Sequence, residues 1–401
     1  MQFFKTMKKS IFLLFAVLFC GIVSISAQEE IPHSVKMLRK GGASRLNIIL
    51  PQVNGYNCYK GDFHIHTSYS DGCITPAGRV NEAWLDGLDI IAITDHYERR
   101  AGEARFMKVI APYAEEGQQL VSLSAQKAGS VKADFEAIHN EAVAQVEKIK
   151  RPLLLIKGCE MTRSTKTSGH FNCLFLKDIN NLYDKDLKVA LRNVREQGGF
   201  IIHNHPGWNR DTSDKNDFHK EVYKEGLIDG VEVVNGTTFY PHIVGRCIDE
   251  KLAMFANTDI HSISPYNQLA NTRGIYRTMT LVFAKELTQE SIREALSKQR
   301  TLAYVGGYVI GNEQLLSDFL NESVTCRKIQ ESKKEGTCRY QLVNNSSIAY
   351  TLRYGKKAFK LEPFKPIFID ARDGDKSLVC DVENMYHRGY KHPSITIKID
   401  K

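Results

Sequence analysis

The sequence contains 401 residues and has a formal net charge of +8, with 54 lysines and arginines against 46 aspartates and glutamates. Basic and acidic residues alternate along the chain, so the sequence lacks the concentrated basic stripe of a nucleic-acid binder. The charge therefore does not indicate a particular binding partner. The length of the chain predicts two domains or one large domain with an appendage.

The first 27 residues have the layout of a cleavable secretory signal. Three lysines precede the apolar run at residues 11–23, and the stretch SISA ends at Ala27. The apolar run is short for a membrane span, so we expect no transmembrane helix after cleavage and a periplasmic or extracellular protein. The stretch VLFC, which ends at Cys20, loosely resembles a lipoprotein processing site and leaves lipid anchoring as the alternative.

Strand-length apolar runs alternate with amphipathic helical stretches up to about residue 310, which is the pattern of an α/β domain. Seven strands are predicted, around Phe63 and at residues 90–93, 153–156, 171–176, 200–202, 230–234 and 253–256. Helices are predicted at residues 76–88, 131–149, 186–197 and 289–298, the last of them after the strand MTLVFA. Short alternating strands after residue 320, broken by turn residues, predict a small β-sandwich-like domain over residues 320–401 with a packing or binding role.

Eight cysteines follow the predicted leader, and none forms a C-x-x-C pair, which argues against a cysteine zinc site. Export permits disulfides, and Cys326 and Cys338 are the most plausible pair by their separation. Cys159 and Cys173 lie in apolar runs and are expected in the core.

Seven of the thirteen histidines fall at the ends of predicted strands or in the turns beside them, together with three acidic residues. The set consists of His64, His66, Asp71, His96, Glu160, His170, His203, His205, Asp259 and His261. In a parallel α/β barrel the strand ends converge on one face, so we expect a shared pocket. His170 is an exception because it precedes its strand. Either that strand runs in the opposite direction, or a long loop brings His170 back over the rim.

The first group, His64 and His66 in GDFHIHTSYSDG, has two interpretations. Side chains two residues apart on a strand point to the same side, so both imidazoles can bind one metal ion. Alternatively, an ordinary strand runs into a polar turn, in which Asp71 before a glycine is a turn former. Imidazole and carboxylate groups recur at successive strand ends, which favours metal binding over a chance placement of each residue.

Over residues 58–310 the sequence resembles the polymerase and histidinol phosphatase (PHP) superfamily of metal-dependent phosphoesterases. The resemblance rests on ordered motifs: H-x-H at His64 and His66, S-D-G at Ser70 to Gly72, ITDH ending at His96, GCE ending at Glu160, GH ending at His170, HNHP at His203 to Pro206, and D-x-H at Asp259 and His261. It implies a distorted seven-stranded (β/α)7 barrel, placed here at residues 58–315 after a lead-in at residues 28–57. A looser resemblance, which includes the signal and the β domain, is to exported members that act on phosphodiesters.

The resemblance also implies three divalent metal ions per chain, with Glu160 as a bridging ligand. The first ion would lie on His64, His66, Glu160 and Asp259, the second on Glu160, His170 and His205, and the third on Asp71, His96 and His261. Nitrogen and oxygen ligands without thiolates suit zinc, manganese or iron. The carboxylates would offset the cationic charge of several ions, which neutral histidines cannot.

This ligand set predicts hydrolysis of a small-molecule phosphate ester, with the choice between diester and monoester left open. A water that bridges two ions becomes the nucleophile, and the ions hold the phosphoryl oxygens. Replacing Glu160 or Asp259 with alanine should therefore abolish hydrolysis. Two alternatives stay open: a hydrolase acting on a carbon-centred ester, lactone or amide, and a metal-containing binding protein without turnover. The oligomeric state is also open.

Residues beside the ligands are candidates for further roles. Arg163 and Arg210 could contact the substrate because a guanidinium donates to phosphate oxygens in a planar fork, although surface arginines are common. His203 could donate a proton to the leaving group or support a ligand, and Asn235 could orient water. Asp95 could support the neighbouring ligand histidine or form a hydrogen bond within a turn. The remaining histidines considered, expected to be bystanders, are His139, His219 and His242.

Overall fold

A computed structural model describes residues 44–98, 134–331, 336–372 and 377–399. Residues Arg45–Lys401 form one compact unit. The predicted signal, the alternative lipid anchor, the first half of the lead-in and the start of the helix predicted at residues 131–149 lie outside the described residues. Among the residues described, no helix combines the length and the apolar character that crossing a bilayer requires.

The α/β part of the chain contains all seven predicted strands and the predicted helices, with shifts of a few residues at their ends. Its strands are β1 Asn57–Asp62, β2 Ile90–Ile93, β3 Leu154–Thr162, β4 His170–Leu174, β5 Phe200–His203, β6 Gly230–Asn235, β7 Thr238–Phe239, β8 Ala253–Asn257, β9 Met279–Ala284, β10 Thr301–Val305 and β11 Tyr308–Ile310. Its helices are α2 Pro76–Leu85, α4 Phe135–Ile149, α5 Leu187–Glu196, α6 Asp217–Lys224, α7 Pro241–Glu250, α8 Tyr266–Arg273, α9 Gln289–Ser297 and α10 Glu313–Ser323.

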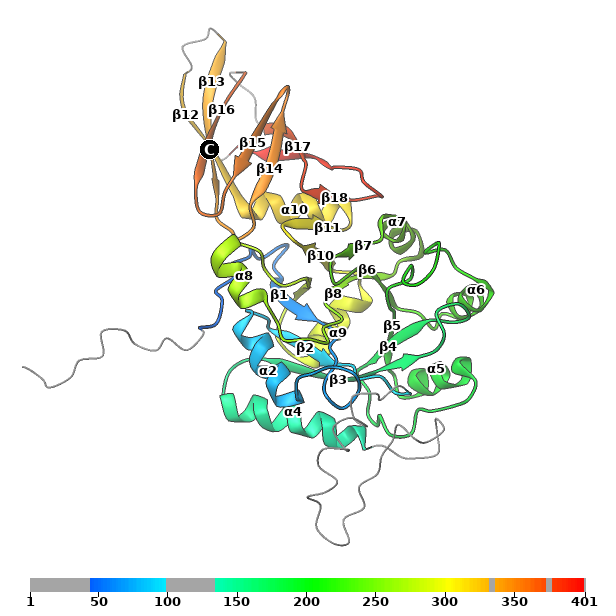
Figure 1. Ribbon diagram of the computed structural model, residues 1–401. Helices are drawn as coiled ribbons and strands as arrows, with labels where there is room; N and C mark the ends of the chain where they lie inside the picture. The colour runs from blue at the N-terminus through cyan, green and yellow to red at the C-terminus, as the bar shows by residue number, and fades with distance from the viewer. Residues whose placement is uncertain (1–43, 99–133, 332–335, 373–376, 400–401) are drawn as a thin grey trace, which may run out of the picture. The chain divides into compact units, whose positions relative to one another are not determined.

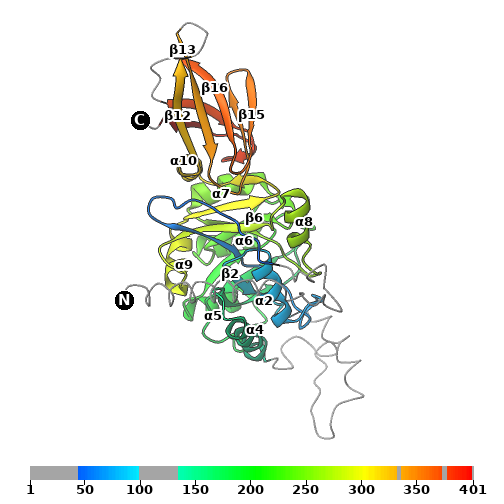
Figure 2. The same cartoon turned by 90° about the vertical axis from the view of Figure 1, so that its left-hand side faces the viewer.

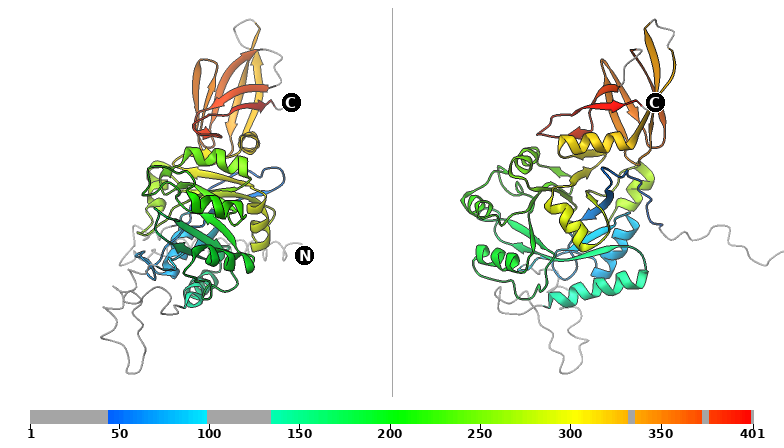
Figure 3. Two further views of the ribbon diagram at one scale, coloured as in Figure 1. Left: turned by 90° about the vertical axis from the view of Figure 1, so that its right-hand side faces the viewer. Right: turned by 180° about the vertical axis from the view of Figure 1, so that it is seen from behind.

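The strands of this part form one curled sheet of mixed direction. β1, β2 and β3 are parallel, β4 is antiparallel to both β3 and β5, and β5, β6 and β8 are again parallel. β9 adds antiparallel to β1 at the other side. Helices α5, α6 and α7 lie outside β4 to β6, and α2 packs against α4 (Figures 1, 2 and 3). The sheet is the distorted barrel that the sequence predicts.

The barrel closes by side-chain hydrogen bonds where β8 approaches β1 and β9. The Phe63 N–H donates to Asn257 Oδ1 at 2.9 Å, and the Ala256 N–H donates to Thr280 Oγ1 at 3.0 Å. Inside the barrel, buried aromatic rings such as Phe63 and Phe255 meet edge to face, with their centroids 5.3 Å apart. This apolar filling forms the floor beneath the carboxyl ends of the strands.

Local sequence explains where the helices begin and end. The Thr75 side chain accepts from the Gly78 N–H and Pro76 follows as the first helical residue, so α2 begins there. The Asp186 side chain accepts from the Lys188 N–H at the start of α5. The glycine pair at residues 198–199 follows α5, as the sequence predicts, and leads directly into β5.

After α10 the chain forms two further small sheets. The first consists of β12 Val324–Glu331, β13 Thr337–Asn344 and β16 Pro366–Arg372, and the second of β14 Tyr350–Tyr354, β15 Lys357–Leu361, β17 Ser377–Val382 and β19 Ser394–Lys398. A two-residue strand, β18 Met385–Tyr386, pairs with β11 of the large sheet. The C-terminal β part predicted from the sequence is therefore present.

The predicted disulfide between Cys326 and Cys338 is wrong. The register of β12 and β13 places Cys326 opposite Leu342 and Cys338 opposite Glu331. The two cysteines are therefore offset by four residues along the strands, which corresponds to roughly 13 Å. A disulfide joins Cα atoms less than about 7 Å apart, so these two cannot pair without a shift of register. Cys159 and Cys173 are buried, as expected.

Candidate metal centre

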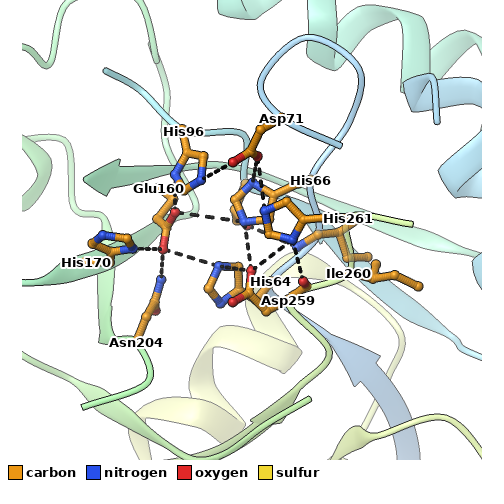
Figure 4. Close-up of polar contacts among 12 residues, drawn as sticks. His64, His66, Asp71, His96, Glu160, His170, Asn204, Asp259, Ile260 and His261 are labelled. Atoms are coloured by element: carbon orange, nitrogen blue, oxygen red, sulfur yellow. Dashed lines mark hydrogen bonds and ion pairs between the residues drawn. The ribbon is translucent and has the colours of Figure 1, made fainter. Parts of the chain in front are cut away.

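The nine predicted metal ligands converge at one end of the barrel. Their imidazole and carboxylate atoms form four overlapping groups of possible ligands, in each of which all atoms lie within 4.8 Å of one another. The groups are His66, Asp71, His96 and His261; His64, His66 and Asp259; His64, Glu160 and His205; and His96, Glu160 and His170. In Figure 4 the labelled imidazole and carboxylate side chains point toward a common centre.

Strand direction explains this convergence. His64 and His66 follow β1, His96 follows β2, and Asp259 follows β8, so parallel strands deliver them to one edge. The bridge between His96 and Glu160 continues the alignment of β2 with β3 and places Glu160 among them.

His170 reaches the same edge because β4 runs in the opposite direction to its neighbours. It is the first residue of β4 and pairs with Thr162, the last residue of β3. Of the two explanations that the sequence left open, the reversed strand is therefore the correct one.

Glu160 occupies the middle of the cluster and has no solvent exposure. Its Oε1 atom lies 3.3 Å from His64 Nε2, 3.2 Å from His170 Nδ1 and 3.7 Å from His205 Nε2. Its Oε2 atom lies 2.5 Å from His96 Nδ1. One carboxylate thus contacts imidazoles on several sides, the arrangement that a ligand shared between ions requires.

Two further carboxylates complete the centre. Asp259 Oδ1 lies 3.2 Å from His64 Nε2 and 3.0 Å from His66 Nε2. Asp71 approaches the other side, with its oxygens 3.1 Å from His96 Nε2 and 3.0 Å from His261 Nε2. Each carboxylate therefore faces a pair of ring nitrogens.

Three imidazoles have one nitrogen occupied by the protein and the other directed at the centre. His64 Nδ1 bonds to Glu232 Oε1 at 2.8 Å, and His96 Nδ1 bonds to Thr162 Oγ1 at 2.7 Å. His261 Nδ1 donates to the carbonyl of Asp259 at 2.8 Å. This arrangement leaves each Nε2 lone pair facing the carboxylates, as metal ligation requires.

The buried nitrogens of the cluster fit a metal centre better than a purely protein network. Among the described residues, five fully buried side-chain atoms have no hydrogen-bond partner, and three of them are His64 Nε2, His66 Nε2 and His170 Nδ1. Buried polar atoms are rarely left unsatisfied, because desolvation costs about 1–3 kcal/mol each. Cations held by these nitrogens and the carboxylates would satisfy all three.

The charges in the cluster shift the pKa values of its members strongly. Burial disfavours the charged form of His96, but the charges and hydrogen bonds of Glu160 and Asp71 together outweigh burial and raise the pKa of His96 to about 10. Burial also opposes ionisation of Glu160, yet the charges of His96 and His64 hold its pKa well below its ordinary value. Hydrogen bonds from His261 and His96 likewise outweigh burial and lower the pKa of Asp71. The carboxylates therefore stay ionised and require compensating positive charge.

Glu232 supports the centre from behind and was missed by the sequence analysis. It lies within β6 with no solvent exposure and accepts from His64 Nδ1 and from the His205 N–H at 2.7 Å. A charged residue in the middle of the apolar strand GVEVVN is the signal that could have revealed it, since buried charges need partners. Asn235 at the end of this strand donates to Glu232 and to Asp259 Oδ2.

Asn204, between the two histidines of HNHP, was also missed. Its Nδ2 atom donates to Glu160 Oε1 at 2.8 Å and to Asn172 Oδ1 at 2.9 Å, and the residue is 1% exposed. These bonds orient the central carboxylate.

The turn after β1 is fixed by two buried side chains. Asp95 accepts from the Thr67 N–H, the Thr67 hydroxyl and the Ser70 hydroxyl, each at 2.6 Å. Of the two roles considered for Asp95, the structure therefore shows the hydrogen bonds within a turn. The Arg79 guanidinium donates to the carbonyls of His66 at 2.8 Å and of His261 at 2.9 Å, which ties the turn to the loop after β8.

That loop is also held by a buried ion-pair cluster. Arg277 lies between Asp62 and Asp86, at 2.7 Å and 3.0 Å. Asp62 accepts from the N–H and the hydroxyl of Thr258, which directly precedes Asp259. The position of Asp259 therefore depends on charges buried below the pocket.

Two proposed ligands have a strained backbone. His205 and Asp259 have φ angles of 24° and 53°, in a region that residues with a side chain rarely adopt. Such conformations cost about 1–3 kcal/mol each and cluster at functional sites. The hydrogen bond from the His205 N–H to Glu232 helps to hold one of them.

Three predicted roles near the centre do not agree with the placement of the side chains. Arg163 pairs with Glu98 and donates to the carbonyl of Asp184, while Arg210 donates to the carbonyls of two residues in its own loop. Neither lines the pocket. His203 is buried away from the pocket, stacks on Phe171 and bonds to the Tyr223 hydroxyl at 2.9 Å, so it cannot reach a leaving group.

The other histidines lie where bystanders were expected. His139 lies within α4 and His242 within the first turn of α7. His219 is buried, accepts from the Asn216 N–H at Nδ1 and donates from Nε2 to the carbonyl of Ser168. None of these histidines lines the pocket.

The centre opens to solvent through a cavity of about 250 Å³. Its walls are Asp71, His96, Glu160, His170, His205, Trp208, Asp259 and His261. Seven of these are predicted ligands, and His64 and His66 lie buried beneath them. The sequence did not lead us to predict Trp208 as a residue of this site.

Comparisons with known proteins identify the family of this chain. Residues 62–253 match the family model of the PHP domain. A two-domain crystal structure from Bacteroides vulgatus, described as containing a predicted PHP-like metal-dependent phosphoesterase, is 32% identical with a TM-score of 0.76. The alignment covers 89% of this chain and 100% of that chain. The chain therefore belongs to the PHP family and has the fold of its metal-dependent phosphoesterases.

Two other solved structures resemble this chain too weakly to support a conclusion about it. A candidate metal-dependent phosphoesterase from Bifidobacterium adolescentis is 15% identical, with a TM-score of 0.37 over 59% of this chain and 96% of that chain. A lesion-specific endonuclease from Pyrococcus furiosus is 15% identical, with a TM-score of 0.36 over 64% of this chain and 59% of that chain. No curated protein matches the chain significantly.

Proposed function

We propose that this protein hydrolyses phosphate monoesters or diesters at a centre of three divalent metal ions. The observation that carries the proposal is the convergence of six histidines and three carboxylates, with three buried ring nitrogens left without a hydrogen-bond partner among the described residues. Zinc, manganese and iron all suit these nitrogen and oxygen ligands. The export signal predicted at residues 1–27 would place the activity outside the cytoplasm.

We assign the proposed ligands to the three ions by the distances between them. His64, His66 and Asp259 would hold one ion, and His170 and His205 a second, with Glu160 shared between them. The more exposed group would hold a third ion through Asp71, His96 and His261. When bound, the ions would supply the Lewis acidity that activates water and stabilises charge on the phosphoryl oxygens.

The protein's own contribution is to keep these groups charged and fixed. In the metal-free centre, imidazole charges hold the pKa values of the Glu160 and Asp259 carboxyls low, so both are ionised and ready to receive the ions. Glu232 and Asn204 fix ligand orientation by direct hydrogen bonds. The site is therefore organised before substrate arrives, which reduces the reorganisation needed in the reaction.

The test is elemental analysis of the purified protein together with hydrolysis of bis-p-nitrophenyl phosphate, p-nitrophenyl phosphate and p-nitrophenyl acetate. We expect hydrolysis of at least one phosphate ester, its loss after chelation and its recovery with added metal. Glu160→Ala and Asp259→Ala should each lose metal and activity, whereas Glu225→Ala, a surface substitution just after α6, should keep both. Full activity in a metal-free preparation, or hydrolysis of the acetate alone, would refute the proposal.

A further inference from the structure

Trp208 differs from every other residue that lines the cavity. Among the described residues, the other seven lining side chains are imidazoles and carboxylates assigned to the proposed ions. The Trp208 indole is 49% exposed, and its ring centroid lies 5.6 Å from that of His170 and 5.2 Å from that of His205. An aromatic face therefore stands at the rim, directly beside two proposed metal ligands.

The loop that carries Trp208 is held at both ends. The Trp208 N–H donates to the carbonyl of His205 at 2.9 Å. Arg210 donates to the carbonyls of Pro206 at 3.1 Å and Asp214 at 2.8 Å, which clamps the loop across its base. The indole thus stays exposed in a fixed backbone, and a preorganised contact group loses little freedom when a ligand binds.

Gly207, just before the tryptophan, reinforces this placement. A Cβ atom built on Gly207 would lie 2.9 Å from the ring of Tyr240, so only glycine allows the loop to pack so closely there. The hydrogen bonds of Arg210 and the close packing at Gly207 together hold the loop that carries Trp208.

We propose that Trp208 is a binding residue that stacks on a planar ring in the organic part of the substrate, which makes aromatic or heteroaromatic phosphate esters the preferred class. This inference rests on the proposed phosphoesterase function. A phosphoryl group held by the ions leaves its organic group to be recognised at the rim, where Trp208 is the one large apolar surface among the described lining residues. Indole rings stack on planar rings with little dependence on their substituents.

The two tryptophans of the chain make a direct binding assay possible. Trp84 lies in α2, with the guanidinium of Arg45 3.8 Å from its ring centroid, and does not line the cavity. We expect AMP and phenyl phosphate, but not ribose 5-phosphate, to quench the intrinsic fluorescence of the metal-loaded enzyme. Trp84→Phe should retain this quenching, and Trp208→Leu should lose it.

Kinetics with matched substrates provide the second measurement. Trp208→Leu should raise KM for phenyl phosphate and AMP by about tenfold, the low to middle part of the range for loss of one stacking contact, with little change in kcat. Trp208→Phe should retain most of the affinity, and KM for ribose 5-phosphate should not change in either variant. Quenching by AMP alone would assign the site to nucleoside esters, and quenching by phenyl phosphate alone would assign it to aryl esters.

Equal KM effects on the aromatic and sugar substrates, or quenching that survives in Trp208→Leu, would overturn the inference while leaving the phosphoesterase proposal intact. Conversely, an enzyme that hydrolyses neither these monoesters nor bis-p-nitrophenyl phosphate would count against the proposed function. The fluorescence assay would still decide whether Trp208 stacks on a planar phosphate ester.

Discussion

Replacing Glu232 with glutamine tests how far the centre depends on a carboxylate that does not line the pocket. Oε1 of this residue accepts from His64 Nδ1 and Asn257 Nδ2, and Oε2 accepts from the His205 N–H and Asn235 Nδ2. Glutamine has the same shape but keeps one acceptor oxygen and replaces the other with a donor NH2 group. Two of the four donors would therefore lose their acceptor.

The expected size of the effect follows from this count. A buried donor without a partner costs about 1–3 kcal/mol, so the variant should lose roughly 2–6 kcal/mol unless the surrounding groups move. The groups free to move include His64, whose rotation would turn its Nε2 atom away from the centre. Because loss of a partner that orients a metal-bound histidine weakens metal affinity by about 10–100-fold, we expect a loss within that range.

Metal affinity can be measured by competition with a chromophoric chelator, and folding by circular dichroism and thermal unfolding of the metal-free protein. Asp229→Asn is the matched control, because Asp229 directly precedes β6 and bonds to Arg195 and the Ile201 N–H. It should lower stability without changing metal affinity. A folded Glu232→Gln protein with the metal affinity of the wild type would refute the reasoning.

Two further substitutions test other parts of the structure. Burial lowers the pKa of His219 to about 4, so between pH 6.5 and 4 the unfolded chain takes up a proton that the folded chain does not, and stability falls on acidification. In His219→Gln the melting temperature should fall less between pH 7 and pH 4.5, and an unchanged pH dependence would contradict this. Arg277→Met leaves two buried carboxylates unpaired, should cost about 3–5 kcal/mol and should lower Tm by at least about 5 °C. Arg339→Met, which breaks an exposed pair, should change Tm little, and equal shifts would count against the buried cluster.

The sequence was sufficient to predict the convergence of the centre because most of its residues follow parallel strands. His64 and His96 follow strands that pair in parallel, so the rule that strand ends share one edge applies directly. To predict where His170 lies, one must know the direction of β4. The sequence contains no local signal that distinguishes an antiparallel strand from a parallel one in a buried sheet. The pairing of Thr162 with His170 supplies that information.

Side-chain direction beyond the strand ends could not be predicted. Arg163 and Arg210 lie close in sequence to ligands, but long side chains bond to whichever carboxylate or carbonyl the folded chain places within their reach. Trp208 could not be placed because its exposure depends on a loop that packs at Gly207 against Tyr240, a residue distant in sequence. Glu232, in contrast, was accessible to sequence reasoning, since a carboxylate within an apolar strand requires a buried donor.

His203 and His205 show why backbone conformation decides the chemistry of this motif. Two residues apart on a continuous strand, their side chains would share one face, and spacing alone could not separate them. The strand ends at His203, and the positive φ of His205 redirects the chain, so that one ring packs on Phe171 and the other faces Glu160. The bond from the His205 N–H to Glu232 stabilises this turn, and Glu232 also orients His64. One buried carboxylate thus links the strained turn at His205 to His64 after β1, so we expect its loss to disturb ligands on both sides of the centre.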